Sequence, residues 1–173
     1  MFEAPSIEET RRKLELRPAR VVGILLAPYF DAEARERIVE QLDFLNEETG
    51  ADVHFCCAGY DNPGANPDAE FVRDLVPVVG PVRRWTFSQR KFAQYVNDLR
   101  DLASWDYSGG IDLLVTAPDL SFRTIVPFRD LESMARAGET RGTSQLIQSV
   151  VAFAKSGHDI ESPDARDWIL AHA

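Results

Sequence analysis

Cysteine and histidine are scarce in this 173-residue sequence, and long apolar runs are missing. Its two cysteines and three histidines form neither a disulfide framework nor a cluster at zinc-ligand spacing. No stretch approaches the roughly 18 consecutive apolar residues of a membrane span. The opening residues MFEAPSIEET carry Glu where a signal peptide has a basic segment followed by an apolar core. We therefore expect a cytoplasmic protein.

The common catalytic motifs are also missing. The turn after the first apolar run reads APYFD, so no G-x-G-x-x-G follows it, and no G-x-x-x-x-G-K-[ST] occurs anywhere. The nucleophile elbow G-x-S-x-G and the zinc motif H-E-x-x-H are absent as well. These absences exclude P-loop ATPases. They also argue against dinucleotide-binding enzymes, α/β-hydrolases and zinc proteases.

What is present is the composition of an ordinary globular domain. Hydrophobic residues make up 45% and charged residues 27% of the chain, which excludes a disordered or fibrous protein. The net charge of −9 favours solubility and argues against extensive binding to nucleic acid or anionic lipid. The length predicts a single α/β domain over residues 1–173. Within it we expect an N-terminal helical extension at 1–18 and a C-terminal helical segment at 120–173.

Apolar runs alternate with amphipathic segments along the chain. Strands are predicted near 22–27, 52–58, 83–87 and 111–116. Amphipathic patterns predict helices near 31–49, 89–104, 128–137, 143–156 and 163–171, and a turn at 106–110. This alternation is typical of a three-layer, Rossmann-like or flavodoxin-like domain. We expect one sheet of about four mostly parallel strands, helices on both faces and extra C-terminal helices.

The two cysteines, Cys56 and Cys57, are adjacent in a predicted strand. Their side chains then point to opposite faces, and both are expected to be small buried hydrophobes. The alternative is a reactive thiol, because His54 lies on the same strand face as Cys56 and a histidine can lower the pKa of a thiol.

Three carboxylates follow three of the apolar runs: Asp31, Asp61 and Asp119. The carboxyl ends of parallel strands share one edge of a sheet, where ligands bind in open α/β folds. Hard oxygen ligands at such an edge suit Mg²⁺, which would support a phosphoryl- or nucleotide-processing enzyme. The structural alternative is that Asp31 caps a helix and that Asp61 and Asp119 are turn or cap residues.

A local excess of positive charge follows the acidic first half of the chain. The basic residues are Arg83, Arg84, Arg90 and Lys91, and the aromatic residue Trp85 lies among them. Such a patch can bind phosphate, nucleic acid or an acidic protein surface. The alternative is a solvated face, or pairing with the acidic half of the same chain.

The C-terminal helices carry more apolar surface than a small sheet needs. Val150, Phe153 and Trp168 are therefore predicted to form an interface with a second subunit or another protein. The alternative is that the last helix folds back and covers residues 143–156 itself.

Taken together, the sequence favours a non-catalytic binding or assembly module of a bacterial-type cytoplasmic protein complex, without a metal or cofactor. The alternative is a small Mg²⁺-dependent phosphoryl- or nucleotide-processing enzyme that uses Asp31, Asp61 and Asp119.

Overall fold

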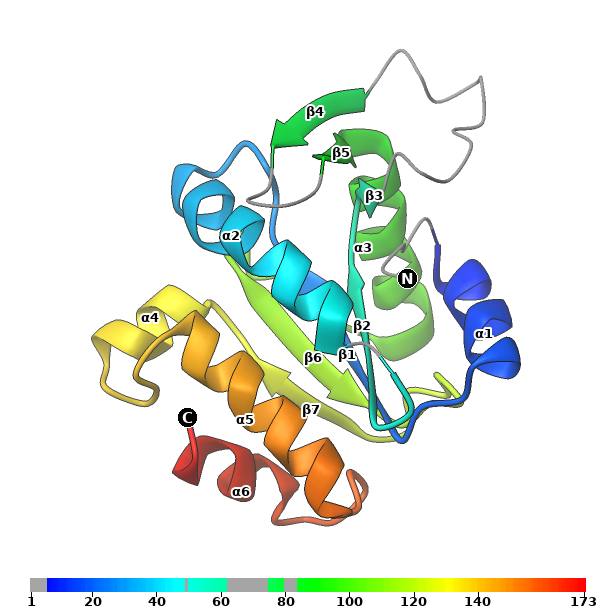
Figure 1. Ribbon diagram of the computed structural model, residues 1–173, viewed down its shortest axis with the longest axis vertical. Coiled ribbons are helices and arrows are strands. Elements are labelled where there is room, and N and C mark those ends of the chain that lie inside the picture. Colours follow the sequence, from blue (N-terminus) through cyan, green and yellow to red (C-terminus); the bar gives the residue numbers. More distant parts are fainter. Residues whose placement is uncertain (1–5, 49, 62–74, 80–83) are drawn as a thin grey trace.

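The computed structural model describes residues 6–48, 50–61, 75–79 and 84–173, which form a mixed α/β fold (Figure 1). The described helices are α1 (Ile7–Leu16), α2 (Ala32–Glu48), α3 (Gln89–Ala103), α4 (Leu131–Arg136), α5 (Thr143–Ser156) and α6 (Ala165–Ala171). The described strands are β1 (Val21–Leu26), β2 (Val53–Cys57), β3 (Tyr60–Asp61), β4 (Leu75–Val79), β5 (Arg84–Ser88), β6 (Asp112–Thr116) and β7 (Ile125–Phe128).

The main sheet has four strands in the order β2-β1-β6-β7 and contains one parallel pair, β1 with β2. The expectation of a mostly parallel, Rossmann-like sheet is wrong at β6, which pairs antiparallel with β1. Val22 lies beside Thr116, and Leu26 lies beside Asp112. The strand predicted at 83–87 belongs instead to a second, antiparallel sheet with the order β3-β5-β4.

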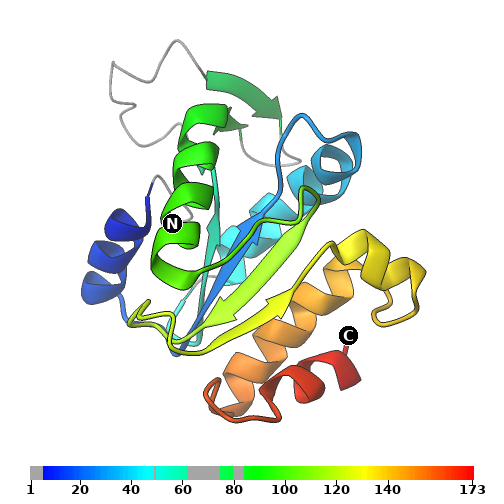
Figure 2. The ribbon, with the colours of Figure 1, turned by 180° about the vertical axis from the view of Figure 1, so that it is seen from behind.

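The connection between α3 and β6 accounts for the reversed strand. Figure 2 shows this segment running back along the molecule before β6 begins. Two aromatic residues hold it there: the Arg129 guanidinium lies 4.3 Å from the Trp105 ring centre, and Tyr107 packs edge-on against Phe92 at 5.5 Å. The chain therefore enters β6 at the end of the sheet where β1 stops. The apolar pattern of residues 111–116 predicts a buried strand but carries no information about its direction.

Burial of the two central strands is as predicted. Every residue of β1 and of β6 is buried, as expected for continuous apolar runs inside a sheet. Helices lie on both sides of the sheet, α2 and α5 on one and α1 and α3 on the other (Figures 1 and 2). Gly23 makes room inside the parallel pair, because a Cβ at this position would stand 2.7 Å from the Phe55 ring. The core thus depends on this close approach of β2 to the β1 backbone.

Capping residues set the starts of three helices. The hydroxyl of Ser6 accepts a hydrogen bond from the Glu9 amide at 3.1 Å, and Ser88 accepts one from Lys91 at 3.2 Å. Asp31 accepts one from the Ala34 amide at 2.8 Å. Each side chain satisfies an amide that the first helical turn leaves unpaired. Asp31 thus caps α2, as the structural alternative for this residue predicts.

The sequence pattern predicts a helix from residue 128, whereas residues Ile125–Phe128 form strand β7. Its Pro127 has no amide hydrogen, and proline is therefore confined to edge strands within a sheet. β7 is such an edge, pairing only with β6 among the described strands. Because proline is rare in strands, the residue pattern at 125–128 does not indicate one.

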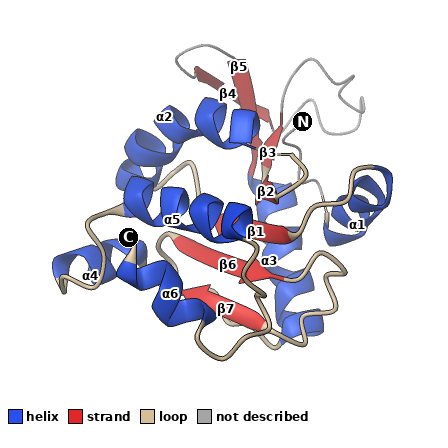
Figure 3. Cartoon of the chain, turned by 60° about the horizontal axis from the view of Figure 1, so that its bottom comes forward, coloured by secondary structure: helices blue, strands red, loops and turns tan. Residues whose placement is uncertain are grey.

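The C-terminal helices fold back on the rest of the chain. α6 packs against α5 and β7 (Figure 3). Val150 and Phe153 are fully buried within this one chain. Trp168 is half-buried, with its ring 5.4 Å from that of Phe153 in an edge-on contact. Val150 and Phe153 are therefore covered within this chain, whereas Trp168 keeps part of its surface exposed, and the interface itself stays a prediction.

Candidate functional site

The antiparallel pairing of β6 separates two of the three candidate carboxylates. Asp31 follows β1 at one end of the sheet, whereas Asp119 follows β6 at the opposite end. Asp31 caps α2, and Asp119 accepts a hydrogen bond from the Ser121 amide at 2.9 Å that lowers the pKa of Asp119. The side chain of Asp61 lies outside the described residues. Within the described ranges, no three His, Cys, Asp or Glu side chains are grouped closely enough to hold a metal ion.

A different carboxylate, Asp112, lies at the end of the sheet where β1 stops. It is fully buried at the first position of β6. Its oxygens accept hydrogen bonds from the Ser108 amide at 3.0 Å, the Ser108 hydroxyl, and the Asp130 amide at 2.8 Å. Asp112 therefore joins the segment before β6 to the loop before α4. All of these hydrogen bonds hold two loops of the chain together, which accounts for the buried carboxylate.

We expect Asp112→Ala to lower the free energy of unfolding by about 2 kcal/mol, because two backbone amides lose their acceptor. Asp119→Ala is the matched control, since Asp119 is exposed and its loss should change stability by about 0.5 kcal/mol or less. Urea titration followed by circular dichroism measures both. Equal losses for the two variants would contradict the structural role given to Asp112.

The predicted basic patch is only partly at the surface. Trp85 is fully buried, and its indole Nε1 donates a hydrogen bond to Asp43 Oδ1 of α2 at 3.2 Å. Trp85 thus belongs to the core and is not available to an external ligand. Arg90 is exposed and Lys91 half-buried in the first turn of α3. Residue 83 and the side chain of residue 84 fall in the part of the chain that is not described.

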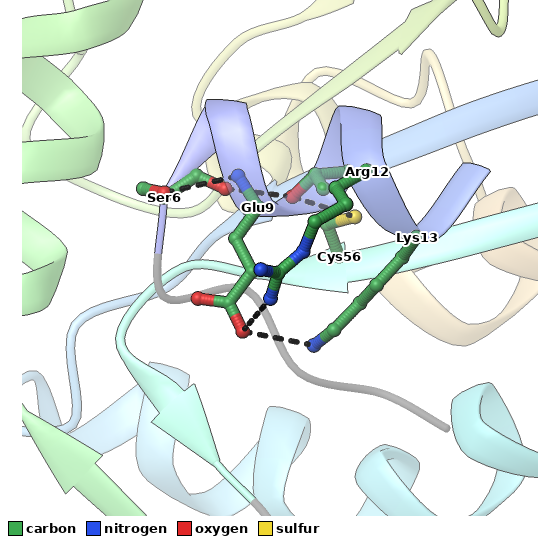
Figure 4. A network of polar contacts seen from close by, with 6 residues as sticks. Ser6, Glu9, Arg12, Lys13 and Cys56 are labelled. Carbon is green, nitrogen blue, oxygen red and sulfur yellow. Dashed lines mark hydrogen bonds and ion pairs between the residues drawn. The ribbon is translucent and has the colours of Figure 1, made fainter. Parts of the chain in front are cut away.

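The thiol of Cys56 faces α1, where it donates a hydrogen bond to the Thr10 hydroxyl at 3.8 Å (Figure 4). Both cysteines are fully buried and unbridged. Burial raises the pKa of Cys56 to about 12 and that of Cys57 well above its usual range. A buried thiol of this kind forms little thiolate at neutral pH. These environments favour the structural interpretation of both residues over the reactive-thiol alternative.

A pocket opens at the other end of the parallel pair, where β1 and β2 begin. Because the two strands are parallel, the connections that precede them lie side by side, and the Arg20 amide donates to the Ala51 carbonyl at 3.1 Å. The pocket has a volume of about 540 Å³, within the range of small-molecule sites. The described residues that line it are Lys13, Leu16, Arg17, Pro18, Gly50, Ala51 and His54.

His54 forms the floor of this pocket, since it is the only buried residue among those that line it in the described structure. Its Nε2 is buried and has no hydrogen-bond partner within the described chain. Burial, together with the positive charge of Lys13, lowers the pKa of His54 from 6.5 to about 4. The imidazole is therefore neutral at physiological pH. A buried polar atom without a partner is uncommon in a native structure and calls for an explanation.

Lys13 of α1 and Arg17 directly after it contribute positive charge to the lining of the pocket. Glu9 makes long ion pairs with Arg12 at 3.9 Å and with Lys13 at 3.8 Å (Figure 4). Arg17, which is exposed at the end of α1, adds a second cation to the lining. The sequence signal for this site is the basic run from residue 11 to residue 20, RRKLELRPAR. This run does not by itself indicate a binding site, because ligands in open α/β sheets are expected at the carboxyl ends of the strands.

Within the described part of the chain, none of the helices combines the length and apolar character needed to cross a bilayer. Comparison of the chain with protein-family models, with curated proteins and with solved structures finds no match.

Proposed function

We propose that this chain is a non-catalytic binding module whose ligand is a small, largely apolar molecule held in the pocket between α1 and β2. The observation that carries this proposal is His54, a buried floor residue with an unpartnered nitrogen beneath a cavity of about 540 Å³. A ligand that supplies a hydrogen-bond partner for this nitrogen would offset the cost of leaving it unpaired.

The walls of the pocket support an apolar ligand. Leu16 is a large hydrophobic side chain that is 79% exposed, and Pro18 and Ala51 extend the same apolar surface. Binding sites for small molecules combine such walls with a few polar groups that orient the ligand. The pocket has this composition, with His54 as the polar group at its floor.

The magnesium-dependent alternative has less support. It requires carboxylates that converge at one edge of a parallel sheet. Asp31 and Asp119 lie at opposite ends of the sheet, and each is engaged by the backbone amide of a neighbouring turn or helix. We therefore retain the binding module as the proposal that the geometry favours.

Two eight-carbon probes, 1-octanol and octanoate, test the proposal. We expect at least one of them to shift the ¹H–¹⁵N resonances of Gly50 and Ala51 in a saturable titration. In Ala51→Trp the indole fills the pocket, and we expect binding of that probe to weaken at least about tenfold because its volume is occupied. Ala152→Trp, an exposed position on α5, is the control and should bind normally. The proposal is wrong if neither probe shifts these resonances, or if Ala51→Trp binds as tightly as the wild type.

A further inference from the structure

We propose that the ligand of this pocket is a small amphipathic carboxylic acid in its ionised form, with the carboxylate beside His54 and Lys13 and the apolar chain along Leu16, Pro18 and Ala51. This inference rests on the binding function proposed above and adds the chemical class of the ligand.

The carboxylate is assigned to the floor of the pocket by two neighbouring groups. A neutral imidazole carries one N–H, and in the Nε2-protonated tautomer His54 donates from the atom that has no partner. Lys13 lies close enough for its charge to act on His54, and its side chain is 21% exposed. Hydrogen bonds from both groups to one carboxylate would be charge-assisted and stronger than those to a neutral oxygen.

The charge of the residues that line the pocket favours a negatively charged ligand. Lys13 and Arg17 are cationic, and none of the described residues that line the pocket is acidic. The nearest carboxylate in the network is Glu9, which is 3.8 Å from the Lys13 ammonium and also contacts Arg12. A cationic ligand would meet two like charges, whereas an anion would be attracted by both. The chain as a whole has a net charge of −9, so the attraction is a local property of this site.

The apolar chain is assigned to the outer wall. The residues nearest the solvent along this wall are Leu16 and Pro18, both exposed in the absence of a ligand. Covering them removes apolar surface from water, which is favourable in proportion to the area covered. The aliphatic stem of Lys13 can pack along the same chain while its ammonium group reaches the acid.

Titrations with octanoate, 1-octanol and octylamine separate the charge of the ligand from its apolar chain, because the three probes share a carbon chain. We expect octanoate to bind about tenfold more tightly than 1-octanol in the wild type, which is the gain from one charge-assisted contact. We expect octylamine to bind more weakly than 1-octanol. In Lys13→Gln the preference for octanoate should fall to about twofold or less. Arg17→Gln, at an exposed position, gives a second variant that should reduce the preference if Lys13→Gln does not fold.

Arg141→Gln is the matched control for net charge. Arg141 is exposed in the turn before α5, and it does not line the pocket. It should keep the full preference for octanoate, because the change in net charge is the same but the site is intact. Equal or tighter binding of 1-octanol or octylamine in the wild type would overturn the carboxylic acid while leaving the proposed binding function standing. An equal loss of preference in Arg141→Gln would also overturn it, whereas the absence of binding by every probe would remove both proposals.

Discussion

Replacing Trp85 with alanine should lower the free energy of unfolding by about 3–5 kcal/mol, the cost of truncating a large buried aromatic side chain. Trp85 has no exposed surface and connects the second sheet to α2 through its hydrogen bond to Asp43. The substitution removes this hydrogen bond and leaves a cavity at the junction of β5 and α2. Denaturant titration of the variant, followed by far-ultraviolet circular dichroism, measures the change.

Two further variants separate the contributions of Trp85. Trp85→Phe keeps an aromatic ring but loses the Nε1–H donor, and we expect it to cost about 1–2 kcal/mol. Phe30→Ala is the control for a surface aromatic residue, because Phe30 is 64% exposed, and it should cost about 1 kcal/mol or less. A loss below 1 kcal/mol in Trp85→Ala would show that this residue is at the surface, as the sequence had indicated.

Acidification from pH 6.5 to pH 4 should destabilise the protein by up to about 3 kcal/mol through His54 alone. The pKa of His54 is about 4 in the folded chain, because burial and the charge of Lys13 on α1 disfavour the imidazolium ion. In the unfolded chain the pKa returns to the ordinary value of about 6.5. Between these two values the unfolded state binds more protons than the folded state. The free energy of unfolding therefore falls as the pH decreases through this window.

The variant His54→Phe removes this contribution. We expect its free energy of unfolding to change less between pH 6.5 and pH 4 than that of the wild type, whatever its stability at neutral pH. His172→Phe is the matched control, because it makes the same substitution at an exposed histidine. Urea titrations at half-unit pH intervals provide the comparison. If the free energy of unfolding falls by the same amount between pH 6.5 and pH 4 in the wild type and in His54→Phe, His54 is not a buried neutral histidine.

The sequence alone determined the local features of this protein. Continuous apolar runs specified the buried strands at 21–26 and 112–116, since such runs are stable only when both faces are covered. Ser6, Asp31 and Ser88 marked helix starts, because capping depends on residues three positions apart in the chain. The classes of protein excluded by composition and by missing motifs likewise follow from the sequence, because neither depends on which segments meet in space.

Tertiary structure decided the direction of β6, and this direction determines whether the carboxylates of the predicted magnesium site lie together. Strand direction is set by where the preceding connection delivers the chain, and here the packing of Trp105 and Tyr107 returns it to the end of β1. That reversal places Asp119 at the opposite end of the sheet from Asp31. The sequence also did not reveal the pocket, because it joins His54 to Lys13, which are 41 residues apart in the chain. Hydrophobic periodicity reports which face of an element is buried and never which distant element covers it.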